Sequence, residues 1–484
     1  MNYSRIEMIR PLILASLFLY SICLSAGDIG HKITFELKNY PSSELIIGYY
    51  LGEQTLVQDT LRSDNADGKF VLEGEDPLRH GVYLMLTQPE VEFIQFLIEE
   101  DQEFTVKTDA KDLGDIEFDG SEVNKRFYNY LDFIKENRVE IQGLNKEKTE
   151  LDSLGKPTEE LVKRIENINT KVRAKQKEVV DKAPLSMIAM LINANKQVDV
   201  PDFEGEEDEV KLKRFRYYKA HYFDHIALDR PETLRTPFLH ERVNYYLEKL
   251  TPSHPDSINS SIDFILSRAK PAEDTYKYYL SHFLNKYHGS KVVGYDAVYV
   301  HLALEYYAKG EASWVDEENL EKIIDKAKRT KPLLIGKHAP DFTAKDSAGI
   351  DYTLSKIDAD YKVLMFWKPD CGHCKKAMPH VVAFQDKFVD RGVKVISFCT
   401  DGRKNIKQCW ESVQEKGMSN LLNLADEQGR SRAQSKFYAT STPYIYILDR
   451  EGKILMKRIG AEQLETVMDE IIKMEEDLEN TDQG

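Results

Sequence analysis

The sequence predicts a multidomain α/β protein. Its C-terminal domain would hold a central sheet flanked by helices, preceded by a small antiparallel β domain and an all-helical middle region. Three patterns carry this prediction. Apolar and polar residues alternate from about residue 30 to 120, apolar residues recur every three or four positions from 121 to 330, and strand-like runs alternate with helices from 333 onward. A length of 484 residues also suits about three domains.

The composition excludes several classes of protein. Acidic residues outnumber basic ones by 82 to 66, for a net charge of -16. We therefore expect no nucleic-acid partner, because phosphate backbones are bound through lysine and arginine. Five cysteines are too few for a fold held together by disulfides. Cysteines that lie close together in this sequence are accordingly expected to serve chemistry.

The first residues predict export. Two arginines precede an uncharged apolar run from Pro11 to Gly27 that ends in small residues, which is typical of a secretory signal peptide. We expect residues 1–26 to be the signal, cleaved near Ala26, with the periplasm as the destination. An uncleaved anchor and lipidation at Cys23 stay open as alternatives, although the run is shorter than the roughly 20 residues of a membrane span. Membrane association is expected only if the signal is retained or lipidated.

Residues 27–120 predict a β-rich accessory domain. Apolar residues occupy alternate positions from Ile33 to Leu37, as in a half-buried strand, and Asp67-Gly68 supplies a turn. Further strands are predicted over Leu45–Tyr50, Lys69–Glu73, Val82–Leu86, Phe93–Ile98 and Glu103–Val106. The segment contains no cysteine, so binding or spacing is the expected role.

Residues 121–330 predict helices. Highly charged residues from Leu151 to Val180, interrupted at Gly155-Lys156-Pro157, indicate a long solvated hairpin whose second helix is capped by Thr158. The run Glu204–Arg216 places acids before bases, which suits the dipole of a solvated helix. Helices rich in tyrosine and phenylalanine follow, and we expect them to form a core. His221 and His225 share one helix face, which we interpret as structural, because no third metal ligand is evident.

Residues 333–480 predict a sheet covered by helices. The expected strands and helices are the strand Val363–Trp367, the helix Cys371–Val389, the strands Val393–Cys399, Tyr444–Leu448 and Lys453–Arg458, and the helix Glu462–Leu478. The first strand leads directly into the first helix, and Cys371-Gly-His-Cys374 stands at this junction.

Two cysteines three residues apart at a helix start can close a small disulfide ring. The helix dipole favours a thiolate at Cys371, and the thiolate is the species that attacks disulfides. Cys374, one turn further on, can then resolve the mixed disulfide. Protonated His373 and nearby Lys375 would add positive potential. Two of the four ligands of a structural zinc site can have the same C-x-x-C spacing. Zinc binding therefore stays an alternative, although it would need further ligands.

The context strengthens the redox interpretation. Phe366-Trp367 precedes the pair, and Thr442-Pro443 stands directly before a predicted strand, which makes Pro443 a candidate for a cis peptide bond. A peroxiredoxin would need a threonine three residues before its cysteine, and this chain has Lys368 there.

These residues resemble the thioredoxin superfamily, and more narrowly the extracytoplasmic TlpA/ResA-like thiol:disulfide oxidoreductases. The resemblance spans roughly residues 333–480. It includes Gly336-Lys-His-Ala-Pro-Asp-Phe342, Gly349, Cys371-Gly-His-Cys374, Met378-Pro379, Thr442-Pro443 and Asp449-Arg-Glu-Gly-Lys453. The family implies a thioredoxin fold in which Cys371 attacks, Cys374 resolves, and the cis-proline Pro443 contacts substrate. We also expect Thr442 to contact substrate and Trp367, His373 and Lys375 to modulate the pair.

Two positions depart from the family. Met365 replaces a buried acid of thioredoxins, and Ala377 replaces a glutamate common in ResA-like proteins. Either acid would help to move the proton of the resolving thiol, so water, His373 or Asp370 must do so here. For Cys399 we expect a small buried residue at a strand end, with pairing to Cys409 as the alternative.

We therefore expect an exported oxidoreductase that exchanges disulfides with exported proteins carrying thiols or disulfides and is reset by an upstream redox partner. It would use its own redox-active disulfide, with no other cofactor and no metal. A scaffold protein whose C-x-x-C is a structural crosslink and a metal-delivery thiol are the alternatives. The sequence fixes neither the direction of exchange nor the oligomeric state.

Overall fold

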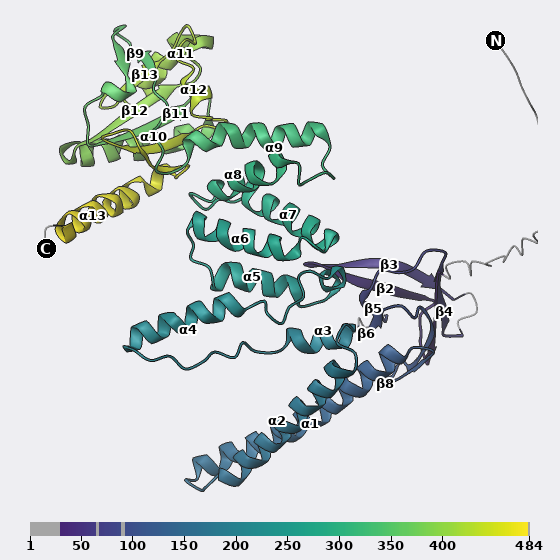
Figure 1. The fold of residues 1–484 in the computed structure, drawn as a ribbon. Helices are drawn as coiled ribbons and strands as arrows, with labels where there is room; N and C mark the ends of the chain where they lie inside the picture. Colours follow the sequence, from purple (N-terminus) through teal and green to yellow (C-terminus); the bar gives the residue numbers. More distant parts are fainter. Residues whose placement is uncertain (1–29, 64–66, 89–91, 483–484) are drawn as a thin grey trace, which may run out of the picture. The chain divides into compact units, whose positions relative to one another are not determined.

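The computed structural model describes residues 30–63, 67–88 and 92–482, so the predicted signal at residues 1–26 lies outside the described residues. The chain forms two compact units (Figure 1). One contains the chain up to Gln197 together with Glu232–Phe238, and the other contains Val198–Pro231 and everything from Leu239 onward. The helical region predicted at 121–330 contributes to both. Among the described residues, no helix combines the length and apolarity needed to cross a membrane.

The predicted β domain is present as two four-stranded sheets around one core. One sheet has the order β4-β1-β7-β8 and the other β3-β2-β5-β6. Phe35 and Phe96, one from each sheet, pack edge to face with ring centres 5.7 Å apart. The strands are β1 His31–Lys38, β2 Glu44–Leu51, β3 Gln54–Arg62, β4 Lys69–Gly74, β5 Gly81–Leu86, β6 Phe93–Ile98, β7 Glu103–Asp109 and β8 Asp112–Asp119.

Pairing in these sheets is antiparallel except between β1 and β7, which run parallel. Sequence patterns missed β3 and β8. Most of their side chains are exposed and polar, so neither strand shows the alternation that marks a half-buried strand.

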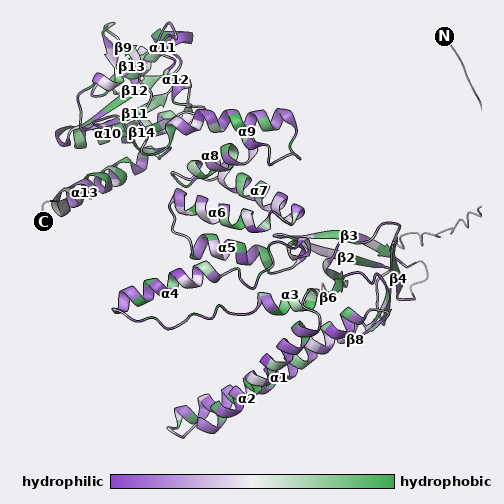
Figure 2. Ribbon diagram, in the orientation of Figure 1, coloured by the Kyte–Doolittle hydropathy of each residue, from purple (hydrophilic) through white to green (hydrophobic). Residues whose placement is uncertain are grey.

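The long helical hairpin is confirmed as α1 Glu122–Ser153 and α2 Glu159–Lys182, followed by the short α3 Met187–Ala194. Figure 2 shows that both long helices are largely hydrophilic. Their apolar contact is a narrow seam of Leu144, Leu161 and Ile168. Thr158 does stand at the start of α2, but the predicted capping bond is wrong, because its hydroxyl donates to Asp152 Oδ1 at 3.0 Å and the side chain caps no backbone N–H.

The second unit begins with α4 Glu207–His221, which buries no side chain, as its charge pattern predicts. Five further helices follow, and their aromatic side chains form a core, as expected; Tyr279, Phe283 and Tyr299 are at most 2% exposed. These helices are α5 Leu239–Lys249, α6 Pro255–Ala269, α7 Glu273–His288, α8 Asp296–Glu305 and α9 Glu317–Thr330.

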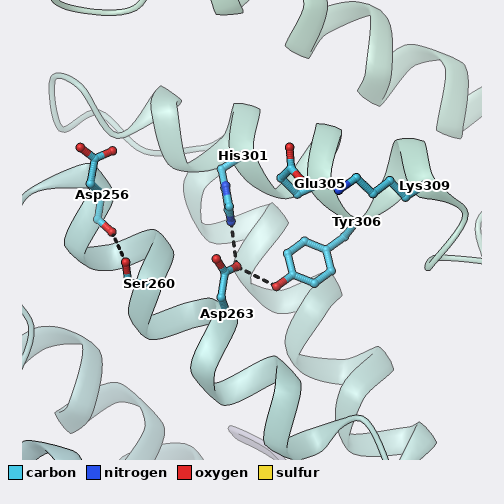
Figure 3. Close-up of polar contacts among 7 residues, drawn as sticks. All are labelled: Asp256, Ser260, Asp263, His301, Glu305, Tyr306 and Lys309. Carbon is cyan, nitrogen blue, oxygen red and sulfur yellow. Dashed lines mark hydrogen bonds and ion pairs between the residues drawn. The ribbon is translucent and has the colours of Figure 1, made fainter.

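A polar contact ties α6 to α8 and to the turn that follows it (Figure 3). Asp263 Oδ1 lies 2.7 Å from His301 Nε2 and accepts a hydrogen bond from the Tyr306 hydroxyl at 2.7 Å. Burial opposes ionisation of Asp263, but these two hydrogen bonds outweigh it and lower the pKa of the carboxyl. The contact is therefore strongest while Asp263 is ionised.

The C-terminal sheet has seven strands in the order β10-β9-β13-β12-β11-β14-β15. One face packs on α10 and α13 through Phe384 and Met468, and the other holds Phe366 and Phe437. The strands are β9 Thr343–Lys345, β10 Asp351–Thr353, β11 Tyr361–Trp367, β12 Val393–Cys399, β13 Leu422–Ala425, β14 Tyr444–Asp449 and β15 Ile454–Lys457. The helices are α10 Gly372–Phe388, α11 Gly402–Glu415, α12 Ala433–Lys436 and α13 Leu464–Asp482.

A buried ion pair joins this sheet to the helices of the same unit. Lys457 Nζ, at the end of β15, lies 2.5 Å from Asp296 Oδ2 at the start of α8, and the lysine side chain is 3% exposed. The lysine also donates to the backbone carbonyl of Leu333, just after α9. Burial lowers the pKa of Lys457, and Asp296 opposes that change.

We predict that Asp263→Asn lowers stability most at neutral pH. Because the folded-state pKa of Asp263 is depressed, its contribution is complete above the ordinary aspartate pKa of about 4 and is lost as the pH falls through the lowered value. A loss of about 1 kcal/mol at pH 7 is expected, discounted for solvent screening because the side chain is 42% exposed. Urea midpoints measured from about pH 7 down to about pH 3 should show the two proteins converging.

Asp256→Asn, on the same helix with an 88% exposed side chain, is the control and should change stability by less than about 0.5 kcal/mol. A difference between Asp263→Asn and the unmodified protein that stays constant over the whole pH range would contradict the role of the carboxylate.

Candidate active site

The first cysteine stands where β11 ends and α10 begins. All seven residues of β11 are buried, as expected for a strand in the middle of the sheet. The chain leaves β11 at the edge of the sheet where α10 begins. Lys368, Pro369 and Asp370 form a short loop, and Cys371 is the N-cap residue of α10. Its backbone is extended while the next residue is helical, which directs the side chain across the helix start.

Two backbone groups hold the sulfur of Cys371. The backbone N–H of Cys374 donates to Cys371 Sγ at 3.1 Å, so the sulfur takes the place of a capping oxygen. The Cys371 thiol donates to the carbonyl oxygen of Thr442 at 3.2 Å. Cys371 is 8% exposed and Cys374 is fully buried, and both are free thiols. Cys371 is therefore the more accessible residue of the two.

The surroundings move the two pKa values apart. Burial opposes ionisation of Cys371, but hydrogen bonds from the Cys374 thiol and from the backbone N–H groups of Cys374 and His373 outweigh it, and the pKa of Cys371 is lowered. Burial and the hydrogen bond to Cys371 raise the pKa of Cys374 to about 11. The two thiols thus differ in how readily they ionise, and this asymmetry suits the chemistry of a mixed disulfide.

Thr442 and Pro443 lie directly beside this pair, although 71 residues separate Thr442 from Cys371. The peptide bond between Thr442 and Pro443 is cis, as the sequence predicts. Pro443 precedes β14, which pairs antiparallel with β11, and this pairing brings the loop to the edge that carries Cys371.

The other predicted site residues take up different positions. The indole of Trp367 is fully buried and donates to Ser397 Oγ at 3.2 Å, so Trp367 supports the site from within the core. His373 and Lys375 are exposed on the first turn of α10. Met365 is fully buried in the same hydrophobic cluster as both cysteines, so the position of the thioredoxin acid is filled by an apolar side chain.

Sequence patterns missed two side chains that reach the site from α11 and the turn after it. Gln408 donates from Nε2 to Asp370 Oδ1 at 2.9 Å. Lys416 Nζ lies 5.8 Å from the ring centre of Trp367. Neither is near the cysteines in sequence, and no local pattern marks either one.

Cys399 and Cys409 form a disulfide. Cys399 does end a strand and is buried at 2% exposure, as expected, but the leading interpretation of it as an unpaired small residue is wrong. Ten residues separate the two cysteines, and the kinked start of α11 returns the chain so that their Cα atoms lie 6.1 Å apart. No helix or strand period predicts that approach.

We predict that the two active-site thiols differ in the pH dependence of alkylation. Cys374→Ser leaves Cys371 as the single site thiol, and it should react with iodoacetamide with a midpoint below the ordinary thiol value of about 8.5. Cys371→Ser leaves the buried Cys374, which should react only well above that value. Mass spectrometry after timed alkylation measures both, and identical pH profiles would contradict the asymmetry.

Three segments of the chain match known protein families. Residues 335–457 match the AhpC/TSA family, residues 162–330 match a domain of unknown function (DUF5106), and residues 31–127 match another domain of unknown function (DUF4369). The AhpC/TSA segment includes Cys371, Cys374 and Thr442-Pro443.

Similarity to individual proteins concentrates in the same segment. Thiol-disulfide oxidoreductase ResA of Bacillus cereus is 27% identical over 143 residues, which cover 29% of this chain and 79% of the relative. Thioredoxin-like protein YneN of Bacillus subtilis is 27% identical over 125 residues, or 26% of this chain and 71% of the relative. A solved thioredoxin-like protein from Bacteroides caccae is 15% identical with a TM-score of 0.42, covering 56% of this chain and 98% of that chain.

The relatives named as thiol-disulfide oxidoreductases support oxidoreductase activity for this domain. Together with the seven-stranded sheet and the free C-x-x-C pair, these matches support a TlpA/ResA-like domain of the thioredoxin superfamily at the C-terminus of this chain.

Proposed function

We propose that this protein exchanges disulfides with exported proteins through Cys371 and Cys374. The observation that carries the proposal is the asymmetry of the pair: the cysteine with the lowered pKa stands at a helix start and is 8% exposed, and its partner is fully buried one turn behind it. A crosslink that served only stability would need neither a lowered pKa nor access to solvent.

The reaction follows from these positions. The Cys371 thiolate attacks one sulfur of a substrate disulfide, the substrate S–S bond breaks, and the released substrate thiolate takes up a proton. Cys374 then loses its proton and attacks Cys371 Sγ, which releases the second substrate thiol. The substrate gains two electrons, and the protein is left with a Cys371–Cys374 disulfide. The same steps in reverse oxidise a substrate dithiol.

Several site residues support this cycle. The Thr442 carbonyl and Pro443 border the reactive sulfur, where the backbone of a bound substrate would lie. Water, the exposed His373 or Asp370, whose Oδ1 accepts a hydrogen bond from Gln408, would carry the proton of Cys374. Trp367 fixes the end of β11, and Lys375 adds positive charge to the first turn of α10.

The remaining assignments belong to the same proposal. The pair needs no organic cofactor and no metal, and an upstream redox protein must restore its starting state after each cycle. Export to the periplasm rests on the apolar N-terminal sequence, with membrane association only if that segment is retained or lipidated.

We predict that the full mature chain catalyses insulin reduction by dithiothreitol and that Cys371→Ser abolishes this turnover, because Cys374, the other free thiol of the described residues, is fully buried. Cys374→Ser should instead accumulate a mixed disulfide with a peptide disulfide, visible as an adduct by mass spectrometry. His380→Ala, at an exposed position further along α10, should retain full activity.

Turnover that persists in Cys371→Ser would overturn the proposed mechanism. If the unmodified protein neither turns over insulin nor forms an adduct as Cys374→Ser, the alternative of a scaffold protein with a structural crosslink takes its place. Stoichiometric metal retained after dialysis against a chelator would instead favour metal delivery.

A further inference from the structure

The disulfide between Cys399 and Cys409 lies in the same buried cluster as the active-site cysteines. Cys399 ends β12 and is the direct neighbour of Trp367 in the parallel pairing with β11. Cys409 is fully buried in α11. A thiolate from solvent has little access to either sulfur, and disulfide exchange requires such access.

The residues beside the two linked cysteines hold both ends of the loop before Cys371. Thr400, next to Cys399, donates to the carbonyl oxygen of Trp367 from its backbone N–H at 2.8 Å and from its hydroxyl at 3.1 Å. Gln408, next to Cys409, donates to Asp370 Oδ1 at 2.9 Å. The disulfide thus closes the segment from Cys399 to Cys409. Residues at the two ends of this segment, Thr400 and Gln408, form hydrogen bonds with Trp367 and Asp370.

The side chain of Gln408 is itself oriented. Asn405 departs from helical geometry inside α11, with φ -157° and ψ 81°. Its Oδ1 accepts the backbone N–H of Gln408 at 3.2 Å, and its Nδ2 donates to Gln408 Oε1 at 3.3 Å. The amide oxygen of Gln408 is therefore engaged, and its NH₂ group is turned toward Asp370.

We propose that the Cys399–Cys409 disulfide is a permanent bond that positions the active-site loop, and that Gln408 is a positioning residue that tunes Cys371 by holding the carboxylate of Asp370. This inference rests on the proposed function, because it concerns the reactivity of the attacking sulfur. The bond stays intact while Cys371 and Cys374 alternate between thiol and disulfide.

The sign of the effect follows from charge. Asp370 directly precedes Cys371, and a carboxylate close to a thiol disfavours its ionisation. The hydrogen bond from Gln408 offsets part of that negative charge and fixes its place. Basic residues also stand near the pair: Lys368 on the loop, His373, Lys375 and Lys376 on α10, and Lys416 against Trp367. Asp370 is the acidic residue that directly precedes Cys371, so release of its carboxylate would oppose the thiolate.

We predict that Gln408→Leu, made with Cys374→Ser in the full chain, slows alkylation of Cys371 at pH 7 by about three- to tenfold, the effect of a rise of roughly half to one pKa unit. Ultraviolet absorbance of the thiolate against pH should show the same rise. Gln408→Lys keeps a donor for Asp370 and should restore the reactivity. Lys407→Ala, whose side chain is 84% exposed on the same helix, should match the parent protein.

Asp370→Asn provides the decisive comparison. Because it removes the charge on which Gln408 acts, Gln408→Leu should have no further effect in that background. Equal alkylation rates with and without Gln408→Leu in the presence of Asp370 would overturn the positioning role. Insulin turnover that persists in Gln408→Leu but is lost in Cys371→Ser would leave the proposed function standing in that case.

We further predict that the two disulfides of the oxidised protein differ in their response to limited dithiothreitol. The Cys371–Cys374 bond should open first, and alkylation followed by mass spectrometry should find Cys399 and Cys409 still linked. Equal labelling of all four cysteines in the folded protein would contradict a permanent bond. This measurement does not depend on whether a Cys399→Ser/Cys409→Ser variant folds.

Discussion

The hydrogen bond from the backbone N–H of Cys374 to the sulfur of Cys371 is the interaction on which the rest of the site depends. It makes the sulfur the cap of α10, so an unsatisfied helix-terminal N–H is paired and the sulfur is placed where negative charge is favoured. It also requires β11 to end at a fixed residue, since a shift of one position would turn the sulfur away from the helix start. The position of the sulfur at the start of α10 thus depends on the central strand β11, on the loop before β14 that lies beside it and on the core beneath it.

The local features of the site could be predicted from the sequence because each depends on neighbours in the chain. The apolar strand run, the paired cysteines at a helix start and the proline before β14 are all short patterns. Gln408 could not be found, because its role depends on a kink at Asn405 and a contact across 38 residues. The short strand β13 and the parallel pairing of β1 with β7 were missed for the same reason: tertiary context decides them.

Two pairs of cysteines share one hydrophobic cluster and are nevertheless suited to different tasks. The difference lies in access and in the groups around each sulfur. Cys371 is at the edge, where backbone N–H groups face it, whereas Cys399 and Cys409 are enclosed by the sheet and α11. A cysteine sulfur can therefore be reactive or inert within a single domain, according to where the fold places it.

The buried pair of Lys457 and Asp296 bears on how such a domain can be exchanged between proteins. A thioredoxin-like domain cut from this chain would keep the lysine but lose both its carboxylate partner and the helices that help to enclose it. Recombination that moves the domain onto another N-terminal partner would therefore leave Lys457 as a solvated lysine and not as a buried charge. The ion pair is therefore specific to the contact between the sheet and α8, and separating the two removes the partner and the burial of the lysine together.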